Sequence, residues 1–241
     1  QNLRAIRSPG APDPFIPFRP EIAYSHEAGL KSQFFDRRLR FNLAAYYTRV
    51  KDLQKSVILP SNTIPPATST AVQNAGRARV YGLEAELLAE PMPGLTLGAT
   101  GTLTRPKYLE YVDPTGTDLS DSRFENVPRH TFTLSAGYEG DAGSFGYNIR
   151  GDYSWQDTTA LQPQNDLETI LYATQPAGGV LNARAGVTFM DDALELAVYG
   201  KNILDNRDQV TGLRVDSYGY ISGRFREPAM YGVEATFRFG N

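Results

Sequence analysis

Apolar and polar residues alternate along much of this chain, and this period of two constrains the fold more than any other feature of the sequence. From Thr131 to Tyr138, Phe, Leu, Ala and Tyr fall on one face, while Thr, Ser and Gly fall on the other. The segments 182–189 and 231–240 repeat the pattern. A helix would place apolar residues three and four positions apart, which these segments do not do. The alternation predicts an all-β chain.

We expect about nine strands, joined by connections that alternate in length. The short connections are rich in turn-forming residues and lie at Asp36–Arg38, Pro91–Gly94, Asp141–Ser144 and Asp191–Ala193. The long connections are polar and rich in Pro and Gly, and they lie at Leu59–Ala71, Val112–Val127, Ala160–Gly178 and Asp205–Arg226. The expected strands lie near residues 21–35, 38–57, 73–90, 95–111, 128–140, 145–158, 179–190, 193–204 and 227–240.

The lengths of these strands favour a membrane barrel over a soluble sheet. Several exceed the usual five or six residues and match tilted strands that cross a bilayer. Short turns on one side and long loops on the other are typical of outer-membrane barrels. Alternation alone also fits a β-sandwich, but aromatic residues such as Tyr108, Tyr138 and Trp155 lie near strand ends, where interfacial girdles belong. We therefore predict an antiparallel up-and-down transmembrane β-barrel.

The strand count predicts that the barrel continues beyond this chain. The chain begins on the long-loop side and ends on the short-turn side, after an odd number of strands. Bacterial single-chain barrels have even strand numbers. We therefore expect further strands before residue 1.

Composition removes several function classes. Lys and Arg number 24 against 27 Asp and Glu, so the net charge of −3 gives no electrostatic case for a nucleic-acid partner. The absence of cysteine excludes disulfides, Cys-ligated zinc and thiol catalysis. The two histidines, His26 and His130, have no partners at metal-ligand or catalytic spacing. An outer-membrane enzyme with a Ser/His site is an alternative class, because His130 precedes a segment that carries Thr and Ser. G-x-S-x-G and phosphate loops are absent from the sequence, so we expect neither an enzyme nor a cofactor.

Four motifs resemble TonB-dependent outer-membrane receptors. Asn202-Ile203-Leu204-Asp205 resembles the N-[LI]-[LF]-D motif near their C-terminus, and residues 74–86 resemble their N-x-x-x-x-x-x-G-[IVL]-E strand. Residues 27–31 resemble their E-x-G-x-K strand, and YGVEATFRF at 231–239 resembles their closing strand. Two positions depart from the family pattern. Asp208 replaces a usual Tyr, and two residues follow the final aromatic, Phe239.

The resemblance implies that residues 1–241 are the C-terminal part of a 22-stranded barrel, without the N-terminal plug and the earlier strands. It implies an active transporter in the bacterial outer membrane that takes up a ferric siderophore or a similar scarce nutrient, energised through TonB. The implied partners are outer-membrane lipid, the receptor's own plug and earlier strands, the TonB complex and a small ligand such as a ferric siderophore. A passive porin-like barrel and a secreted β-sandwich that binds glycans are the alternatives.

Two groups of residues are candidates for function. Charges on the polar face would line the lumen and meet the plug, or simply pair across strands; they are Glu84, Glu86, Arg150, Asp152, Arg184, Glu195, Lys201, Glu234 and Arg238. Arg and Tyr in the long loops suit an anionic or aromatic ligand, although loop residues also cover a barrel mouth; they are Arg123, Tyr172, Arg214, Tyr218, Tyr220 and Arg224.

Overall fold

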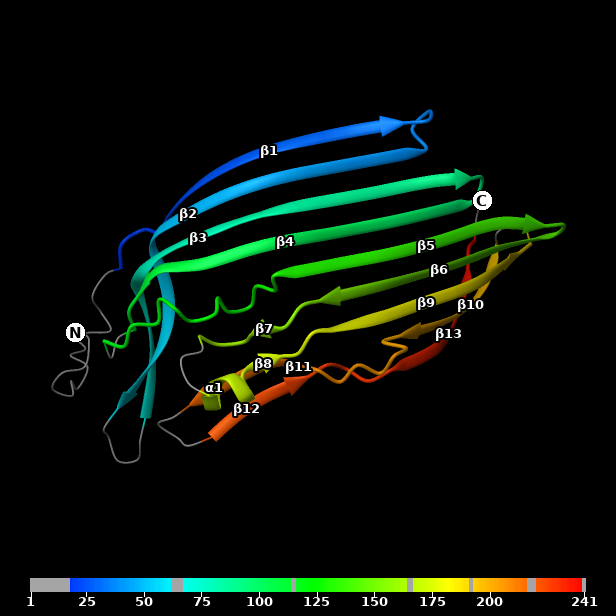
Figure 1. The fold of residues 1–241 in the computed structure, drawn as a ribbon. Helices are drawn as coiled ribbons and strands as arrows, with labels where there is room; N and C mark the ends of the chain where they lie inside the picture. Colours follow the sequence, from blue (N-terminus) through cyan, green and yellow to red (C-terminus); the bar gives the residue numbers. More distant parts are fainter. Residues whose placement is uncertain are drawn as a thin grey trace.

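The computed structural model describes residues 18–61, 67–113, 116–163, 167–190, 193–215 and 220–239. Within them, nine antiparallel strands form one sheet in the order β1-β2-β3-β4-β5-β6-β9-β10-β13 (Figure 1). The strands are β1 (Ile22–Phe34), β2 (Leu39–Ser61), β3 (Ala67–Met92), β4 (Leu95–Tyr111), β5 (His130–Ala142), β6 (Phe145–Gln156), β9 (Gly178–Phe189), β10 (Leu194–Lys201) and β13 (Met230–Phe237). The predicted nine-stranded meander is therefore confirmed.

The long connections are more structured than the sequence suggested. The connection after β6 contains β7 (Thr159–Ala160), α1 (Leu167–Tyr172) and β8 (Thr174–Gln175). The connection after β10 contains a hairpin of β11 (Gln209–Val215) and β12 (Tyr220–Phe225). The predicted loop at 59–71 was wrong in most of its length, because β2 and β3 stay paired as far as Ser61 and Ala67. The β-branched residues Thr68 and Thr70 continue the ladder, and Thr68 pairs with Pro60 within it.

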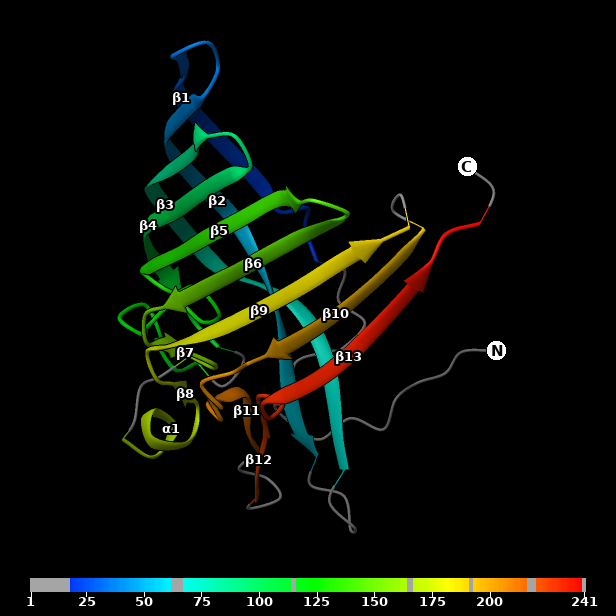
Figure 2. The same cartoon turned by 90° about the vertical axis from the view of Figure 1, so that its right-hand side faces the viewer.

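The sheet curves but does not close. Seen along its strands, it forms an open arc, and the loops gather at one end while the tight turns lie at the other (Figures 1 and 2). In the sheet order, β1 and β13 stand at the two ends, so each keeps one edge without a partner among the described residues. The described residues contain no helix that is long and apolar enough to cross a membrane.

The two faces of the sheet differ in chemistry. Outward positions on the convex face carry large apolar side chains that stay exposed, among them Leu83 at 44%, Leu134 at 51% and Val233 at 83%. The alternate positions on the concave face are polar. No second sheet among the described residues packs on the apolar face, as a sandwich would require. An exposed apolar belt is the pattern of a wall that faces lipid.

The main buried cluster lies beyond this belt, where β2, β3 and β4 extend towards the loops. Tyr108 and Ala78 are fully buried there, opposite each other in the ladder. Phe124 from the following loop stacks on the Tyr108 ring at 4.4 Å. Lys55 forms an ion pair with Glu125, and the Glu125 carboxylate also accepts a hydrogen bond from the Tyr108 hydroxyl. This cluster fixes the loop after β4 against the sheet.

Tyrosines lie over glycines of the neighbouring strand at several points. Tyr46 faces Gly82 and Tyr199 faces Gly232 in the ladder. A Cβ atom on Gly82 would lie 2.7 Å from the Tyr46 hydroxyl and 2.2 Å from a main-chain oxygen, and one on Gly232 would lie 2.5 Å from the Tyr199 ring. Glycine is therefore required beneath each ring. Gly82 and Gly232 belong to two similar segments, YGLEA at 81–85 and YGVEA at 231–235. The glycine that the two segments share is explained by this close packing between strands.

Candidate functional site

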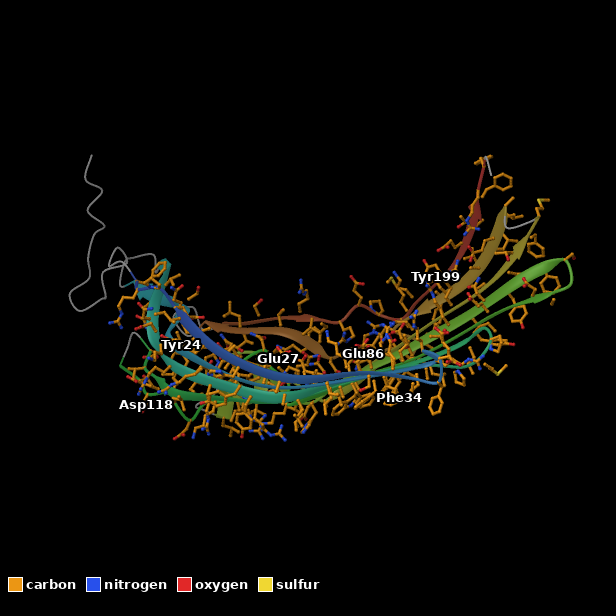
Figure 3. All side chains as sticks on the ribbon, turned by 90° about the horizontal axis from the view of Figure 1, so that it is seen from above. Tyr24, Glu27, Phe34, Glu86, Asp118 and Tyr199 are labelled. Carbon is orange, nitrogen blue, oxygen red and sulfur yellow. The ribbon has the colours of Figure 1, made fainter. Side chains whose placement is uncertain are left out.

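The concave face of the sheet carries the nine predicted charges. Strand register places their positions on one face, from Glu84 and Glu86 on β3 to Glu234 and Arg238 at the C-terminal end. Figure 3 shows this trough from above, with Tyr199 on the concave side and Phe34 on the convex side. A hollow of about 930 Å³ lies in it. Its walls include Arg150, Asp152, Arg184, Glu195, Lys201 and Glu234.

Four of these charges form one connected network. Arg184 contacts Glu195 at 2.8 Å and Glu234 at 2.9 Å, and Arg238 contacts Glu195 at 3.0 Å. Arg184 and Glu195 have side chains only 15% and 11% exposed. Asn148 accepts a hydrogen bond from Arg184 and donates one to Glu195. The network ties β6, β9, β10 and the C-terminal segment together across the sheet.

Side-chain amides support two of the three remaining carboxylates, Glu86 and Asp152, and sequence reasoning did not single out these amides. Asn42 donates to Glu86 at 2.8 Å, and Asn182 donates to Asp152 at 2.8 Å. Each pair joins neighbouring strands. The only available signal was their position on the polar face, because Asn carries no charge to attract attention in a sequence.

The long loops contact one another to form a cap at their end of the sheet. Asn126, after β4, donates its main-chain N–H to the carbonyl oxygen of Ala160, after β6. Gln209 of β11 donates to the carbonyl oxygen of Tyr172 in α1. Ala160 and Ala173 are 2% and 1% exposed, so the cap has a small interior of its own.

Five of the six loop candidates lie in the described part of this cap. Arg123 and Tyr172 are exposed, the first in the loop after β4 and the second at the end of α1. Arg224 is exposed on β12, and Arg214 and Tyr220 are residues of the same hairpin. The register of the hairpin pairs Arg224 with Thr211 and Arg214 with Ile221. Tyr218 lies outside the described residues.

The turn after β10 is built around Asn202 and Asp205, the polar residues of the Asn-Ile-Leu-Asp motif. Both have positive φ, at 48° and 51°, a conformation that Asn and Asp tolerate better than most residues. The buried Asn202 amide donates to the carbonyl oxygens of Asn206 and Glu227. Asp205 accepts a hydrogen bond from the main-chain N–H of Ala229 at 2.9 Å. The motif therefore fixes both ends of the connection between β10 and β13.

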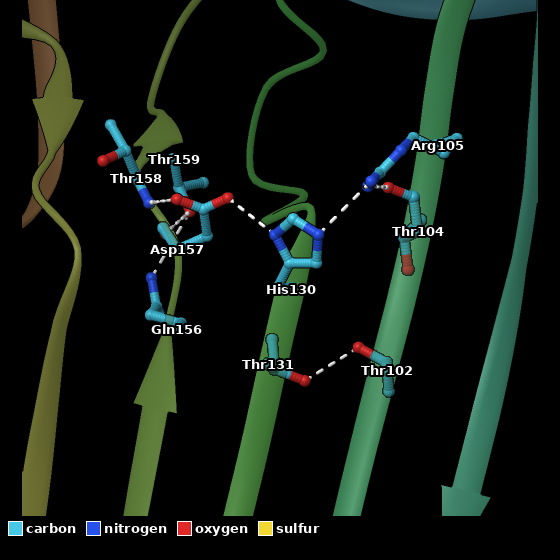
Figure 4. A network of polar contacts seen from close by, with 9 residues as sticks. All are labelled: Thr102, Thr104, Arg105, His130, Thr131, Gln156, Asp157, Thr158 and Thr159. Atoms are coloured by element: carbon cyan, nitrogen blue, oxygen red, sulfur yellow. Dashed lines mark hydrogen bonds and ion pairs between the residues drawn. The ribbon is translucent and has the colours of Figure 1, made fainter.

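His130 lies in a polar bridge at the long-loop end of β5 (Figure 4). Its Nδ1 is 3.0 Å from Asp157, and its Nε2 is 3.2 Å from Arg105. Because a guanidinium can only donate, Nε2 accepts and Nδ1–H donates to the carboxylate. The hydrogen bonds from His130 and the Thr158 main-chain N–H hold the pKa of Asp157 below its usual range. The bridge therefore joins the start of β5 and the end of β6 to Arg105 within β4.

The described residues contain no group of three or more His, Cys, Asp or Glu side chains able to hold a metal ion.

Comparison with known proteins gives a consistent result. The family model described as TonB dependent receptor-like, beta-barrel matches residues 2–203. The ferric-pyoverdine M114 receptor PbuA of Pseudomonas sp. (strain M114) is 28% identical over 91% of this chain, which spans 25% of that receptor.

Solved structures show the same fold. The ferric yersiniabactin uptake receptor FyuA from Yersinia pestis superposes with a TM-score of 0.72 at 19% identity, over 91% of this chain and 30% of that one. The ferripyoverdine receptor of the outer membrane of Pseudomonas aeruginosa gives 0.60 at 18% identity, over 90% and 27%. The chain thus spans about a quarter of the length of the curated relative it matches. It belongs to the TonB-dependent receptor-like β-barrel family, whose members are proteins of the Gram-negative outer membrane.

Proposed function

We propose that this chain is the C-terminal part of the barrel wall of an outer-membrane receptor that imports a ferric siderophore or a similar scarce iron chelate. Energy would reach the receptor from the TonB complex, acting on the receptor's N-terminal plug. The observation that carries the proposal is the two-faced open sheet, apolar outside and polar inside, with interlocked loops at one end. The receptors named above for pyoverdine and yersiniabactin support the ligand class.

The concave charges have two roles in this proposal. Arg184 and Glu195 stabilise the wall, because their side chains are mostly buried and already paired. Arg150 and Lys201 line the hollow and form no ion pair within the described part of the chain. They remain available to contact the plug.

The cap provides the groups for ligand recognition. Arg123 and Arg224 are exposed cations, and Tyr172 presents an exposed ring. A guanidinium can bind a carboxylate or another anionic oxygen of a chelate with two parallel hydrogen bonds. Loops on a rigid scaffold are where binding residues gather. We therefore assign ligand contact to the loops and wall formation to the strands.

The test uses the full-length receptor in which this chain lies. Arg123→Gln and Arg224→Gln keep hydrogen-bonding capacity and remove charge. Affinity for an anionic ferric siderophore should fall by about 1.5–3 kcal/mol for each charged hydrogen bond lost, with the folded fraction unchanged. Arg37→Gln, in the turn at the opposite end, is the matched control. Unaltered binding in both variants, and after deletion of residues 163–176, would show that this part of the barrel contributes no ligand contact.

Uptake measurements separate active transport from a passive pore. Uptake of the radioactive iron chelate should stop when the cells lack the TonB complex. Uptake that continues unchanged without that complex would replace the proposal with a porin-like function.

A further inference from the structure

A row of cations crosses three strands on the convex face. Arg49 of β2 faces Arg79 of β3 in the ladder, and Arg79 faces Lys107 of β4. All three residues occupy outward-facing positions of their strands, on the same face as the apolar belt. Arg49 and Lys107 are exposed, and Arg79 is half-buried. We refer to Arg49, Arg79 and Lys107 as the cationic row.

The cationic row lies immediately beyond the lipid-facing belt, on the long-loop side. Tyr47 and Tyr81 face each other in the ladder two residues below Arg49 and Arg79. Leu83 and Leu103 form the next outward pair. Tyrosine girdles mark the level at which the bilayer core meets the headgroups. The row is therefore at headgroup level.

The charged side chains in the described part of the chain do not neutralise the row. Among the described residues, Arg49, Arg79 and Lys107 form no ion pair, and the Nε of Arg79 is buried without a hydrogen-bond partner. Two carboxylates at this end of the sheet are already engaged with other partners. Glu110 pairs with Arg77 at 2.8 Å, and Asp157 contacts His130 at 3.0 Å.

The convex face adds further positive charge beside the row. Lys51 is the next outward-facing residue of β2 after Arg49, and its Nζ lies 5.2 Å from the centre of the Tyr24 ring. Arg105 lies one outward step below Lys107 and faces Tyr81 in the ladder. Like charges directly opposite each other on adjacent strands destabilise a sheet. An external anion at this level would remove that cost.

We propose that the cationic row binds the headgroup of a membrane lipid that carries two or more phosphates. Three strands at about 4.8 Å spacing separate the outer members of the row by roughly 10 Å, so the row can contact two phosphates of one headgroup. Guanidinium groups bind phosphate oxygens with paired hydrogen bonds, and Lys adds a point charge. The lipid's acyl chains would then lie on the apolar belt directly below.

The proposal goes beyond ligand import, and its test does not depend on uptake. The full-length receptor would be placed in nanodiscs of phosphatidylcholine that contain a bisphosphorylated lipid A-type glycolipid, and retained glycolipid would be measured by native mass spectrometry. Each basic residue near a charged lipid surface contributes a factor of about five in affinity. The triple variant Arg49→Gln/Arg79→Gln/Lys107→Gln should therefore lose on the order of a hundredfold.

The control variant removes the same charges elsewhere. Lys31→Gln/Arg37→Gln/Arg38→Gln also loses two arginines and one lysine, but from the concave face and the short turn, and it should retain the lipid. If the triple variant assembles poorly, Arg49→Lys/Arg79→Lys and the single variant Lys107→Gln keep the test open. The first should hold most of the lipid, and the second should lose about fivefold.

Three results would overturn the proposal. One is undiminished retention of the glycolipid by the triple variant. Another is an equal loss in the control variant. The third is binding of free pyrophosphate as tightly as the glycolipid, which would show a simple anion site in place of a lipid site.

Discussion

A paired substitution on β5 tests the assignment of the two faces. Leu134 lies on the convex face, opposite Ala99 and Tyr153, with 51% of its surface exposed. Ser135, its neighbour, lies on the concave face opposite Asp152. Arginine on the lipid face of a barrel costs about 2–4 kcal/mol near the midplane of the bilayer. Leu134→Arg should therefore lower the folding equilibrium constant by a factor between roughly 30 and 900.

The companion substitution, Ser135→Arg, should be far milder. Its guanidinium would face lumen water and the carboxylate of Asp152 on the adjacent strand, so we expect a cost below about 1 kcal/mol. The measurement is denaturant unfolding of the full-length receptor in phospholipid vesicles, followed by the change in gel mobility between folded and unfolded barrel. If both variants unfold at the same denaturant concentration, or if Ser135→Arg is the weaker protein, the convex face does not contact lipid.

Three further outcomes are expected. Expressed alone, the chain should need detergent and show no uptake, because two strand edges stay open; a monodisperse, detergent-free monomer with cooperative unfolding would contradict this. Arg184→Ala should destabilise the receptor by about 2–3 kcal/mol, since it leaves the mostly buried Glu195 short of a partner. Arg77→Ala removes a half-exposed ion pair and should cost less than about 1 kcal/mol, measured by the same unfolding assay. Because the pKa of Asp157 is depressed in the folded protein, the ionised carboxylate stabilises the fold above about pH 4, and this contribution is lost as the pH falls through the native pKa. Amide hydrogen exchange near His130 should therefore become faster on acidification of the wild type. The Asp157→Asn variant should already show the faster exchange at neutral pH.

Alternation allowed the nine strands and both faces to be predicted from the sequence. Each side chain on β5, for example, can point to only one of the two faces of the sheet, and the alternation from Phe132 to Tyr138 shows which face is apolar. The same rule gave the common face of the nine charges. It could not give their partners, because the contact of Arg184 with Glu234 depends on a register between distant strands.

The loops were harder to predict for a different reason. Their order comes from contacts between segments that are far apart in sequence, such as Gln209 with Tyr172 and Asn126 with Ala160. No local periodicity records such contacts. The buried Tyr108 was assigned to an interfacial girdle, whereas it is the centre of the cluster that holds the loop after β4. An aromatic residue at a strand end has the same pattern in both situations.

The glycines beneath the tyrosine rings have a consequence for how the strands find their alignment. A slip of one residue is prevented by the alternation itself, since it would turn every apolar side chain inward. A slip of two residues keeps both faces intact and needs another safeguard. After such a slip, Tyr46 would face Val80 or Glu84 in place of Gly82, and Tyr199 would face Met230 or Glu234 in place of Gly232. Neither alternative leaves space for the ring. The Tyr–Gly pairs therefore disfavour, by steric clash, alignments of the barrel wall that are shifted by two residues.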